Sequence, residues 1–426
     1  MNTAVRSSIH AHSDSATSTT CRFCDAPLSH TFVDLGMSPL CQTQIHEEDL
    51  ERGENFYPLH VYVCEQCFLV QLDEFVAPDV IFGEDYPYFS SYSDSWIEHV
   101  RRYTEQMRSE QGIDQSSFVV ELASNDGYLL QHFVQAGIRC LGVEPTAGTA
   151  RVAQQKGIPT VVEFFGEEVA ARLASEHGHA DLVLGNNVMA HVPNLNDFVK
   201  GIAVMLKPDG FCTFEFPHLL RLIEHNQYDT IYHEHFSYLS YSTMCKVFAH
   251  HGLEMFDVEQ LPTHGGSLRI YGQPAGTGKR EKTQRYHDLL AEEKAAGIFD
   301  LALYSGFEKR VHETKRRLLS FLIEAKDAGK TVVGYGAPGK GNTLLNYCGI
   351  RTDLLDYTVD RNPMKHGTYT PGTRIPILKP EAIAETRPDY VLILPWNLRK
   401  EIESSHSYIR EWGGKFVVPI PSVEVF

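Results

Sequence analysis

The amino-acid sequence predicts an α/β protein with a small cysteine-containing module, a central parallel sheet and a second α/β unit at the C-terminus. Two C-x-x-C pairs stand near the N-terminus. Short apolar segments then alternate with helix-like segments across residues 118–216, and the alternation starts again at residue 331. Because parallel neighbours need a crossover connection, which is usually a helix, this alternation is typical of doubly wound parallel sheets.

Length, charge and hydropathy limit the classes of function. With 426 residues the chain is too long for one ordinary core, so two or three domains are expected. The net charge of −17 argues against nucleic-acid binding, which needs clustered Lys and Arg to neutralise phosphates. The longest apolar runs, such as residues 390–394, suit buried strands and are far too short to cross a membrane.

The N-terminus and the cysteine usage indicate the compartment. Residues 1–20 are rich in Ser, Thr, Ala and His and lack the apolar region of a secretion signal, so we expect a disordered tail. The chain has nine cysteines, and five of them lie outside any pair: Cys41, Cys140, Cys212, Cys245 and Cys348. This pattern favours reduced thiols in a cytoplasm over an oxidised secreted scaffold.

The two C-x-x-C pairs predict a structural zinc site in a module over residues 21–80. Cys21 with Cys24 forms the first pair, and Cys64 with Cys67 forms the second. Two such turns supply the tetrahedral sulfur set that Zn²⁺ prefers, and the long segment between them must hold secondary structure. The alternatives are two disulfides or unrelated thiols. Four neighbouring side chains are able to replace a ligand: Cys41, His30, His46 and His60.

Residues 81–278 are predicted to form the central domain. Helices are expected at 96–107 and 127–136. Four short apolar segments are expected to be its strands: 118–122, 140–144, 181–184 and 210–216.

Residues 279–330 are charged, poor in Pro and rich in helix formers. They also carry an intermittent apolar stripe, which indicates a helical connection that packs between domains. A second α/β domain is expected over residues 331–426. Its predicted strands are 331–335, 355–359 and 390–394.

The first strand of the central domain runs into a turn of small residues that suits a nucleotide cofactor. This turn, residues 121–127, lets a ligand approach the backbone, and the helix N-terminus after it offers unpaired N–H groups. Glu144, which closes the second strand, is placed to accept hydrogen bonds from ribose hydroxyls. Ala123 and Asn125 depart from G-x-G-x-x-G, which argues against a dinucleotide. The alternative is an ordinary βα turn beside a solvated glutamate.

These residues resemble the cofactor region of class I S-adenosylmethionine methyltransferases, in the segments 120–127, 142–145 and 206–210. The whole arrangement is similar to one family in that class. This family comprises the sugar C-methyltransferases that act on nucleotide-linked 4-keto-deoxysugars in antibiotic sugar pathways. Beyond the cysteine module, five segments carry the resemblance along nearly the whole chain: 88–95, 187–191, 232–237, 264–267 and 334–342.

The resemblance implies a fold, cofactors and a reaction. A class I methyltransferase sheet would lie between a zinc-binding module and a Rossmann-like domain, with S-adenosylmethionine and Zn²⁺ as cofactors. The reaction would move a methyl group to a carbon α to the ketone of a dTDP-linked 4-keto-deoxysugar, at C3 in preference to C5. Six residues are expected to bind the cofactor: Glu121, Ala123, Asn125, Gly127, Glu144 and Asn186.

Methylation at carbon needs an enolate, and therefore a base and a donor to the developing oxyanion. The segment 232–235 (Tyr-His-Glu-His) is well equipped for this, and its spacing differs from the H-E-x-x-H of zinc proteases. The resemblance carries over Tyr232, Glu234 and His235, with His235 as the expected base and Glu234 as the alternative. His191 is expected to polarise the keto oxygen or bind the sugar, and Tyr86 to close the site.

A second glycine turn opens the C-terminal domain. Residues 334–339 match G-x-G-x-x-G after a strand, while Gly341 stands where a P-loop needs Ser or Thr, which excludes an ATPase. In the resembled family this domain helps to bind the nucleotide diphosphate, and backbone N–H groups with Lys340 suit that role. The expected substrate-binding residues are His264, Gly336, Lys340, Asn342, Asp360 and Lys365. The alternatives are a simple turn at His264 and a degenerate domain kept for packing.

Two other functions fit parts of the sequence. An NAD(P)-dependent nucleotide-sugar oxidoreductase would bind its cofactor at residues 334–339. A non-catalytic, zinc-containing interaction protein would keep only relic nucleotide pockets. We further expect a cytoplasmic monomer without nucleic-acid or membrane partners.

Overall fold

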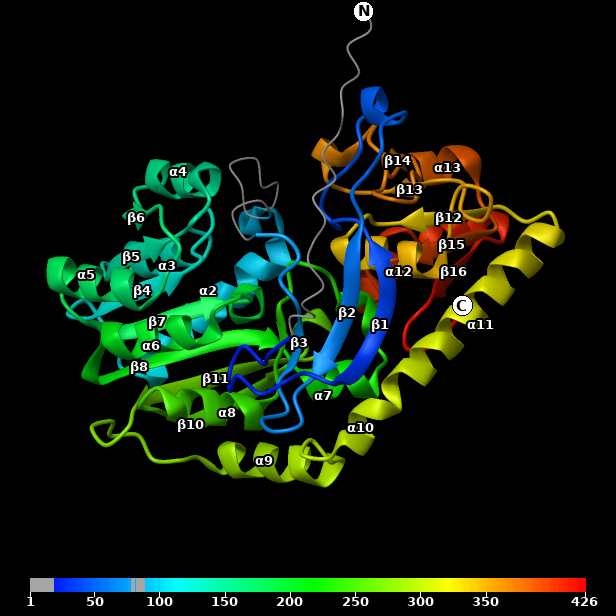
Figure 1. Cartoon of the computed structure of the whole chain (residues 1–426). Coiled ribbons are helices and arrows are strands. Elements are labelled where there is room, and N and C mark those ends of the chain that lie inside the picture. Colours follow the sequence, from blue (N-terminus) through cyan, green and yellow to red (C-terminus); the bar gives the residue numbers. More distant parts are fainter. Residues whose placement is uncertain (1–18, 78–80, 82–88) are drawn as a thin grey trace, which may run out of the picture.

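The computed structural model describes residues 19–77, 81 and 89–426. These residues form an N-terminal, a central and a C-terminal sheet, with helices packed around them (Figure 1). Nearly all of the expected tail, and Tyr86, lie outside the described residues. Among the helices of the described ranges, none combines the length and the apolar character that a membrane crossing needs.

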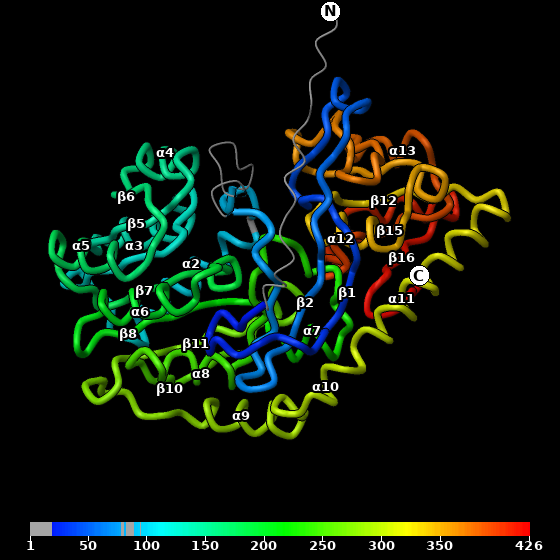
Figure 2. Tube along the Cα trace, in the orientation of Figure 1, coloured from blue at the N-terminus to red at the C-terminus, as the bar shows by residue number. Residues whose placement is uncertain are grey.

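The N-terminal lobe is an antiparallel sheet that takes its last strand from the central domain. Strands β1 (His30–Ser38), β2 (Tyr57–Val63) and β3 (Val70–Leu72) follow one another, and β9 (Ser237–Tyr238) pairs with β3. The β1–β2 hairpin confirms the secondary structure predicted between the cysteine pairs. This hairpin runs between the central sheet and the C-terminal unit (Figure 1, Figure 2).

The central sheet has the strand order β10-β11-β8-β7-β4-β5-β6. Its parallel strands are β4 (Phe118–Leu122), β5 (Arg139–Val143), β6 (Thr160–Val161), β7 (Ala180–Asn186) and β8 (Leu206–Pro217). The four predicted strands are therefore confirmed, with small shifts at their ends. The antiparallel strands β10 (Leu253–Leu261) and β11 (Ser267–Pro274) extend the sheet beyond β8 and were not predicted, because strand–helix alternation indicates parallel neighbours only.

Successive side chains of the central strands point in opposite directions, and both faces of the sheet are apolar. Helices therefore cover both faces. Val119 packs into the core beneath three helices: α2 (Asp94–Glu110), α3 (Leu130–Gln135) and α4 (Ala147–Gln155). Val120 and Leu122 pack into the opposite core, against three others: α5 (Glu167–His177), α6 (Leu195–Met205) and α8 (Tyr241–His250). Helix α7 (Leu219–Glu224) follows β8. The predicted helices at 96–107 and 127–136 correspond to α2 and α3.

The turn after β4 is a tight structure with three residues in the left-handed backbone region. Ala123, Asn125 and Gly127 have φ values of 54°, 50° and 76°. A Cβ atom on Gly127 would lie 2.3 Å from Cδ1 of Ile158, so glycine is needed there for close packing. Ala123 adopts the same backbone region despite its Cβ, which explains how the turn forms without the glycine usual at that position.

The helical connection predicted at 279–330 is confirmed as α9 (Gln284–Ala296), α10 (Leu301–Ser305) and α11 (Phe307–Asp327). Glu293 of α9 is fully buried and joins this connection to the central domain. Its carboxylate contacts His218 Nε2 at 2.7 Å and accepts hydrogen bonds from the backbone N–H groups of Tyr241 and Ser242. Glu293 therefore caps the N-terminus of α8 from outside its own domain.

The C-terminal sheet has the order β14-β13-β12-β15-β16-β17 and is parallel except for β17. Its strands are β12 (Val332–Tyr335), β13 (Thr358–Val359), β14 (Ile377–Leu378), β15 (Tyr390–Ile393), β16 (Lys415–Val418) and β17 (Glu424–Val425). Its helices are α12 (Gly339–Cys348), α13 (Ala382–Thr386) and α14 (Arg399–Ser405). The three predicted strands are confirmed, although the second is reduced to its last two residues.

The parts share their hydrophobic cores. Phe32 and Val61 of the N-terminal lobe pack in one cluster with Leu318 of α11 and Val332 and Leu344 of the C-terminal unit. The lobe therefore contributes to a core that spans several segments of the chain, which fixes its position beside the C-terminal domain.

Candidate active site

A cavity of about 640 Å³ opens at the ends of β4, β5 and β7 and reaches the glycine turn of the C-terminal domain. Ten predicted site residues line it: Ala123, Asn125, Glu144, Asn186, His191, Tyr232, Glu234, His235, His264 and Lys340. Six others, all in the described part of the chain, do not: Glu121, Gly127, Gly336, Asn342, Asp360 and Lys365. Tyr86 lies outside the described residues.

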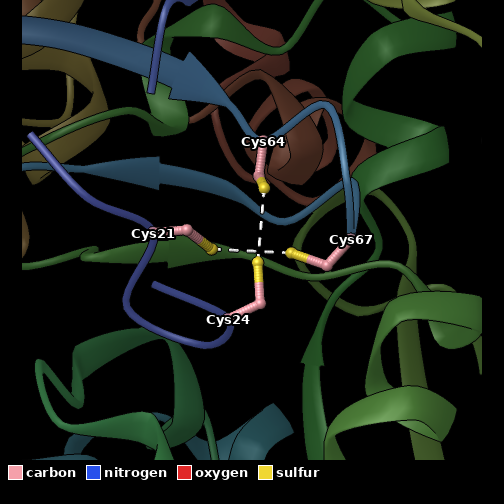
Figure 3. A group of neighbouring side chains, drawn as sticks. All are labelled: Cys21, Cys24, Cys64 and Cys67. Atoms are coloured by element: carbon pink, nitrogen blue, oxygen red, sulfur yellow. Dashed lines mark hydrogen bonds between the residues drawn. The ribbon is translucent and has the colours of Figure 1, made fainter. Parts of the chain in front are cut away.

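The four paired cysteines converge at the base of the N-terminal lobe (Figure 3). All four sulfur atoms lie within 4.8 Å of one another, with 3.5 Å between Cys21 and Cys67 and 3.6 Å between Cys24 and Cys64. These separations are too long for disulfides, and a tetrahedral ion with Zn–S bonds of about 2.3 Å holds its sulfurs about 3.8 Å apart. The residues therefore fit Zn²⁺.

The side chains considered as replacement ligands lie elsewhere. His30 contacts Glu65 and His60 contacts Thr31, both on the exposed surface of the lobe, and His46 is also exposed. Cys41 is buried 3.8 Å from a carboxylate oxygen of Glu234, next to the cavity. The ligand set is thus the four paired cysteines.

The zinc lobe also supports the segment that carries the predicted base. Gln71 of β3 donates to Sγ of Cys21 at 3.1 Å, and it pairs with Ser237 of β9. Phe236, directly after His235, donates its N–H to the carbonyl of Ala190 at 2.7 Å. The segment 232–235 is therefore held between the zinc lobe and the 3-10 turn η3 (Met189–His191) that carries His191.

His235 is buried at the centre of this arrangement with a defined tautomer. Its Nδ1–H donates to the carbonyl of Thr230 at 2.9 Å, which leaves the lone pair of Nε2 free to accept a proton. The Tyr232 and His191 rings lie 4.0 Å and 4.7 Å from the His235 ring. Burial and the neighbouring His191 lower the pKa of His235 well below its usual value, so the ring is neutral.

His191 is neutral for the same reason. Burial lowers the pKa of His191 to about 4, and a hydrogen bond to the backbone of Glu234 only partly opposes this shift. Burial and the negative charge of Glu234 raise the pKa of Cys41 well above its usual value, so Cys41 remains a thiol that donates to Glu234. Two neutral imidazoles, a phenol and a carboxylate therefore meet in one part of the cavity.

The cofactor end of the cavity has the features that a nucleoside with an amino-acid group needs. The carboxylate of Glu144 accepts backbone N–H bonds from Asn125 at 2.8 Å and from Thr146 at 2.9 Å, which fixes its orientation. The side-chain nitrogen of Asn186 is buried and has no hydrogen-bond partner among the described residues. A buried donor of this kind requires a ligand or water, so the site fits a polar cofactor.

Glu121 and Gly127 belong to β4 and the turn after it, at this end of the cavity, but do not line the cavity. Glu121 is fully buried, and burial raises the pKa of its carboxyl group well above the usual value. Gly127 permits the close contact with Ile158 described above.

Lys340 is the predicted substrate-binding residue of the C-terminal domain that lines the cavity. Its Nζ donates to Asn397 at 2.9 Å and lies 4.8 Å from the centre of the Trp396 ring. Burial lowers the pKa of Lys340, although the carboxylate of Asp229 opposes this shift. Lys340 also lies just inside the N-terminus of α12, where a negatively charged ligand is stabilised.

The other predicted residues of this domain support the turn rather than the cavity wall. Asp360 accepts the backbone N–H of Ala337 at 2.7 Å, and Lys365 donates to the carbonyl of Ala337 at 2.8 Å. Asn342 donates to the carbonyl of Cys41 at 2.7 Å, and Gly336 lies against Pro395. In a dinucleotide site the carboxylate of Asp360 would bind the ribose, whereas here it is bonded to the backbone of Ala337.

Sequence reasoning missed several cavity residues. Gln42 reaches the cavity from the N-terminal lobe, and Trp96 reaches it from α2. Asn187 follows Asn186 at the end of β7, a position at which polar residues often serve ligands in parallel sheets. Its position at the end of a parallel strand could have identified Asn187 as a ligand-binding candidate. The sequence around Gln42 contains no comparable feature.

Comparison with known proteins identifies the family. C-methyltransferase NovU of Streptomyces niveus is 38% identical to this chain over 405 residues, which cover 95% of the chain and 96% of the relative. The chain belongs to the C-methyltransferase family. Models of a zinc binding domain, a methyltransferase domain and a C-methyltransferase C-terminal domain match residues 21–82, 96–258 and 262–421 of this C-methyltransferase.

Other similarities cover less of the chain. Ubiquinone biosynthesis O-methyltransferase of Ralstonia nicotianae is 29% identical over 102 residues, which are 24% of this chain and 43% of the relative. Magnesium protoporphyrin IX methyltransferase of Synechocystis, solved with bound S-adenosylhomocysteine, has 14% identity and a TM-score of 0.34 and covers 42% of this chain and 83% of its own. An S-adenosylmethionine-dependent methyltransferase of Anabaena variabilis has 13% identity and a TM-score of 0.35. The similarity covers 41% of this chain and 83% of the Anabaena chain.

The protein is thus an S-adenosylmethionine-dependent C-methyltransferase with an N-terminal zinc-binding domain. The hypotheses of an NAD(P)-dependent oxidoreductase and of a non-catalytic interaction protein are not supported. When bound, S-adenosylmethionine supplies an electrophilic methyl group. Ala123, Asn125, Glu144 and Asn186 are the residues that would hold it.

Proposed function

We propose that this C-methyltransferase methylates a carbon α to the ketone of a nucleotide-linked 4-keto-deoxysugar, at C3 in preference to C5. One observation supports the proposal above others. A single cavity joins the cofactor turn at Asn125 and Glu144 to the imidazoles of His191 and His235, and then to Lys340. A cofactor, a keto group and a diphosphate would each meet a suitable part of this cavity wall.

His235 is the base in this proposal. A carbon next to a ketone becomes a nucleophile once its proton is removed, because the ketone accepts the resulting charge as an enolate. The Nε2 atom of His235 is unprotonated and belongs to a residue that lines the cavity, while Nδ1–H is held by Thr230. Glu234 is the alternative base, since its carboxylate also belongs to the cavity wall.

The enolate oxygen needs hydrogen-bond donors. Tyr232 and His191 flank His235, and the phenol O–H of Tyr232 is assigned as the donor because it carries no full charge. The low pKa of His191 keeps its ring neutral, and the single N–H of that ring donates to the backbone of Glu234, so of its two predicted roles we assign sugar binding to His191. Donors preorganised in a buried site stabilise the developing charge without reorganising solvent.

Lys340 and the N-terminus of α12 are assigned to the nucleotide diphosphate. A lysine ammonium and the unpaired N–H groups of a helix N-terminus are both recognised phosphate ligands. We infer dTDP as the nucleotide and antibiotic deoxysugar synthesis as the setting, on the family resemblance of residues 334–342. The expected enzyme acts as a cytoplasmic monomer.

The test is methyl transfer by the His235→Asn variant. The wild-type enzyme is expected to convert a dTDP-linked 4-keto-deoxysugar and S-adenosylmethionine into a C-methylated sugar, followed by mass spectrometry. His235→Asn is expected to lower kcat by at least about 10²-fold, the usual contribution of a general base, with unchanged binding of S-adenosylhomocysteine.

His233→Asn is the matched control. His233 stands in the same segment but does not line the cavity. Its Nε2 atom contacts the carbonyl of Pro58 at 3.2 Å. This variant should retain turnover. Unimpaired methylation by His235→Asn would reject His235 as the base, and no wild-type turnover on any nucleotide-linked keto-deoxysugar would reject the substrate class.

A further inference from the structure

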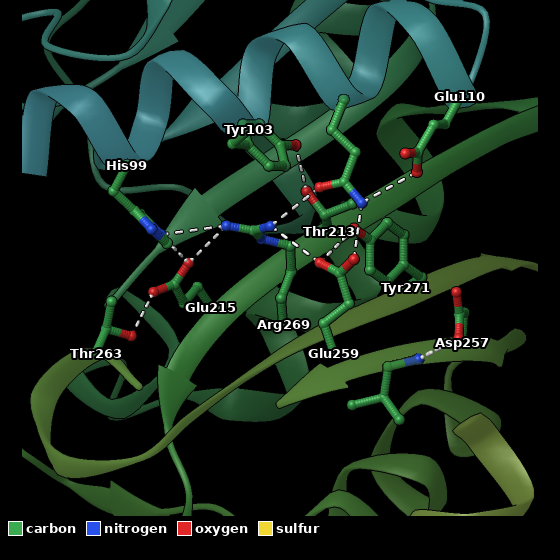
Figure 4. Close-up of polar contacts among 12 residues, drawn as sticks. His99, Tyr103, Glu110, Thr213, Glu215, Asp257, Glu259, Thr263, Arg269 and Tyr271 are labelled. Carbon is green, nitrogen blue, oxygen red and sulfur yellow. Dashed lines mark hydrogen bonds and ion pairs between the residues drawn. The ribbon is translucent and has the colours of Figure 1, made fainter. Parts of the chain in front are cut away.

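A cluster of charged and polar side chains lies between α2 and the strands β8, β10 and β11 (Figure 4). Its centre is Glu215, near the end of β8, whose side chain is fully buried. One carboxylate oxygen contacts Nε2 of His99 at 2.8 Å and Nη2 of Arg269 at 3.0 Å. The other accepts the hydroxyl of Thr263 at 2.9 Å. The mechanism above does not use any of these residues.

Three of the contacts of Glu215 lead to residues that line the cavity. Thr263 begins the 3-10 turn η5 (Thr263–Gly265), and His264 is the next residue. His99 stacks on Trp96 with ring centres 4.9 Å apart. The main-chain carbonyl of Glu215 also accepts the N–H of Asn187 at 2.7 Å. Trp96, Asn187 and His264 all belong to the cavity wall.

The turn that carries His264 depends on such an anchor. His264 has a φ of 54°, a left-handed backbone conformation that is strained for a non-glycine residue. Its Nε2 accepts a hydrogen bond from the side-chain amide of Asn187 at 3.2 Å, so the neutral ring carries its proton on Nδ1. A strained residue persists where its surroundings hold it in place.

The charged neighbours of Glu215 keep its carboxylate ionised. Burial alone would raise its pKa, but the hydrogen bond from His99 and the positive charge of Arg269 lower the pKa overall. A buried carboxylate with three partners is a rigid anchor, because each partner is costly to leave unpaired.

The structure assigns Glu215 as a positioning residue: through Thr263 it holds His264, and through His99 it holds Trp96, in the wall of the cavity. The identity of the sugar rests on the proposed function, whereas the placement of the two rings follows from the contacts above. Neither Glu215 nor Thr263 lines the cavity, so their effect on catalysis is indirect.

The same cluster provides a matched control. Glu259 also pairs with Arg269, at 3.0 Å, and accepts hydrogen bonds from Tyr271 at 3.0 Å and from Gln106 at 2.7 Å. Its side chain does not contact Thr263 or His99 in the described structure, and it does not line the cavity. Replacing Glu259 therefore disturbs the cluster without releasing the cavity wall.

The experiment compares four variants with the wild-type enzyme: Thr263→Val, Thr263→Ser, Glu215→Gln and Glu259→Gln. For each we would measure kcat and KM for the keto-sugar, the Kd for S-adenosylhomocysteine and the melting temperature. Thr263→Val keeps the shape of the side chain but removes the hydroxyl. It is expected to lower kcat/KM about tenfold, which corresponds to about 1.4 kcal/mol, with a cofactor Kd within twofold of wild type.

Thr263→Ser should restore kcat/KM to within threefold, because it keeps the hydroxyl. Glu259→Gln should lower the melting temperature but leave kcat/KM within twofold. The inference is overturned if Thr263→Val matches wild type, or if Glu259→Gln lowers kcat/KM as much as Thr263→Val. Should Glu215→Gln fail to fold, the two Thr263 variants still decide. A wild-type enzyme that is inactive on every keto-deoxysugar would count against the proposed function. The inference about Glu215 would then still be tested by the ratio of kcat/KM between each variant and the wild type on any substrate that the enzyme accepts.

Discussion

His235 lies beneath the carbonyl of Thr230 with its ring against Tyr232, and this setting determines its chemistry. The hydrogen bond to Nδ1 selects the tautomer whose Nε2 accepts a proton. Burial removes the charged form, since an imidazolium loses its hydration there. The same physics applies to His191. Each ring is therefore neutral as a result of its surroundings, and Nε2 of His235 is suited to take a proton.

This account predicts an unusual acid limb in the pH profile. A lowered pKa means that His235 remains in its base form somewhat below pH 6.5, where more than half of an unperturbed histidine would be protonated. The kcat/KM of the wild-type enzyme should therefore stay level from pH 8 to 6.5 and fall only at lower pH. Melting temperatures at each pH control for unfolding. A midpoint at or above pH 6.5 would contradict the assignment.

At the scale of elements, the decisive feature is the pairing of β3 with β9. This short ladder joins Val70 to Tyr238 and Gln71 to Ser237, and β9 begins two residues after His235. Gln71 in turn donates to a sulfur of the zinc site. The zinc site therefore supports the catalytic segment through one strand, although no cysteine of the set lines the cavity.

Removal of zinc is expected to lower turnover more than cofactor binding. Loss of the ion releases four thiolates, which loosens β3 and, through β9, the segment 232–235. The cofactor residues Asn125 and Glu144 stand on the central sheet and should be less affected. The measurement is kcat and the Kd for S-adenosylhomocysteine before and after chelation. Zinc should restore kcat, and full turnover by the metal-free enzyme would refute the link.

Across the whole molecule, the site is an assembly of three regions distant in sequence. The C-terminal domain holds the catalytic region through Trp396, whose indole N–H donates to Asp229 at 2.7 Å, and through Thr343, whose hydroxyl donates to the carbonyl of Ile231 at 3.0 Å. Lys340 lies beside Trp396 and faces the cavity. A ligand that spans the central and C-terminal domains would thus contact a preassembled wall.

Lys340→Met should separate nucleotide binding from cofactor binding. Loss of the ammonium removes a charge-assisted contact to phosphate, which contributes about 1.5–3 kcal/mol, so the KM for the sugar nucleotide should rise about tenfold or more. The Kd for S-adenosylhomocysteine should not change. Lys330→Met, at an exposed ion pair with Asp389, is the control and should have no effect. An unchanged KM would remove Lys340 from the nucleotide site.

Local patterns predicted most of the fold, and many of the residues expected in the site line one cavity. The apolar segment 118–122 and the paired cysteines are short-range signals, and both were confirmed. The pairing of β3 with β9 was not predictable, because it joins segments more than a hundred residues apart and β9 has only two residues. Asp360 was expected to bind substrate on the family resemblance, and the structure shows its carboxylate on the backbone N–H of Ala337, outside the residues that line the cavity. Which side chain faces a ligand depends on packing that spacing does not encode.

Proton removal at the sugar carbon is the step on which the proposal depends, and solvent exchange measures it without methyl transfer. The enzyme with bound S-adenosylhomocysteine would be incubated with the dTDP-linked 4-keto-deoxysugar in deuterium oxide, and the sugar analysed by NMR. We predict deuterium at C3 with the wild-type enzyme and at least a hundredfold slower exchange with His235→Asn. Exchange by His235→Asn at the wild-type rate, or no exchange by a wild-type enzyme that methylates this sugar, would contradict the account.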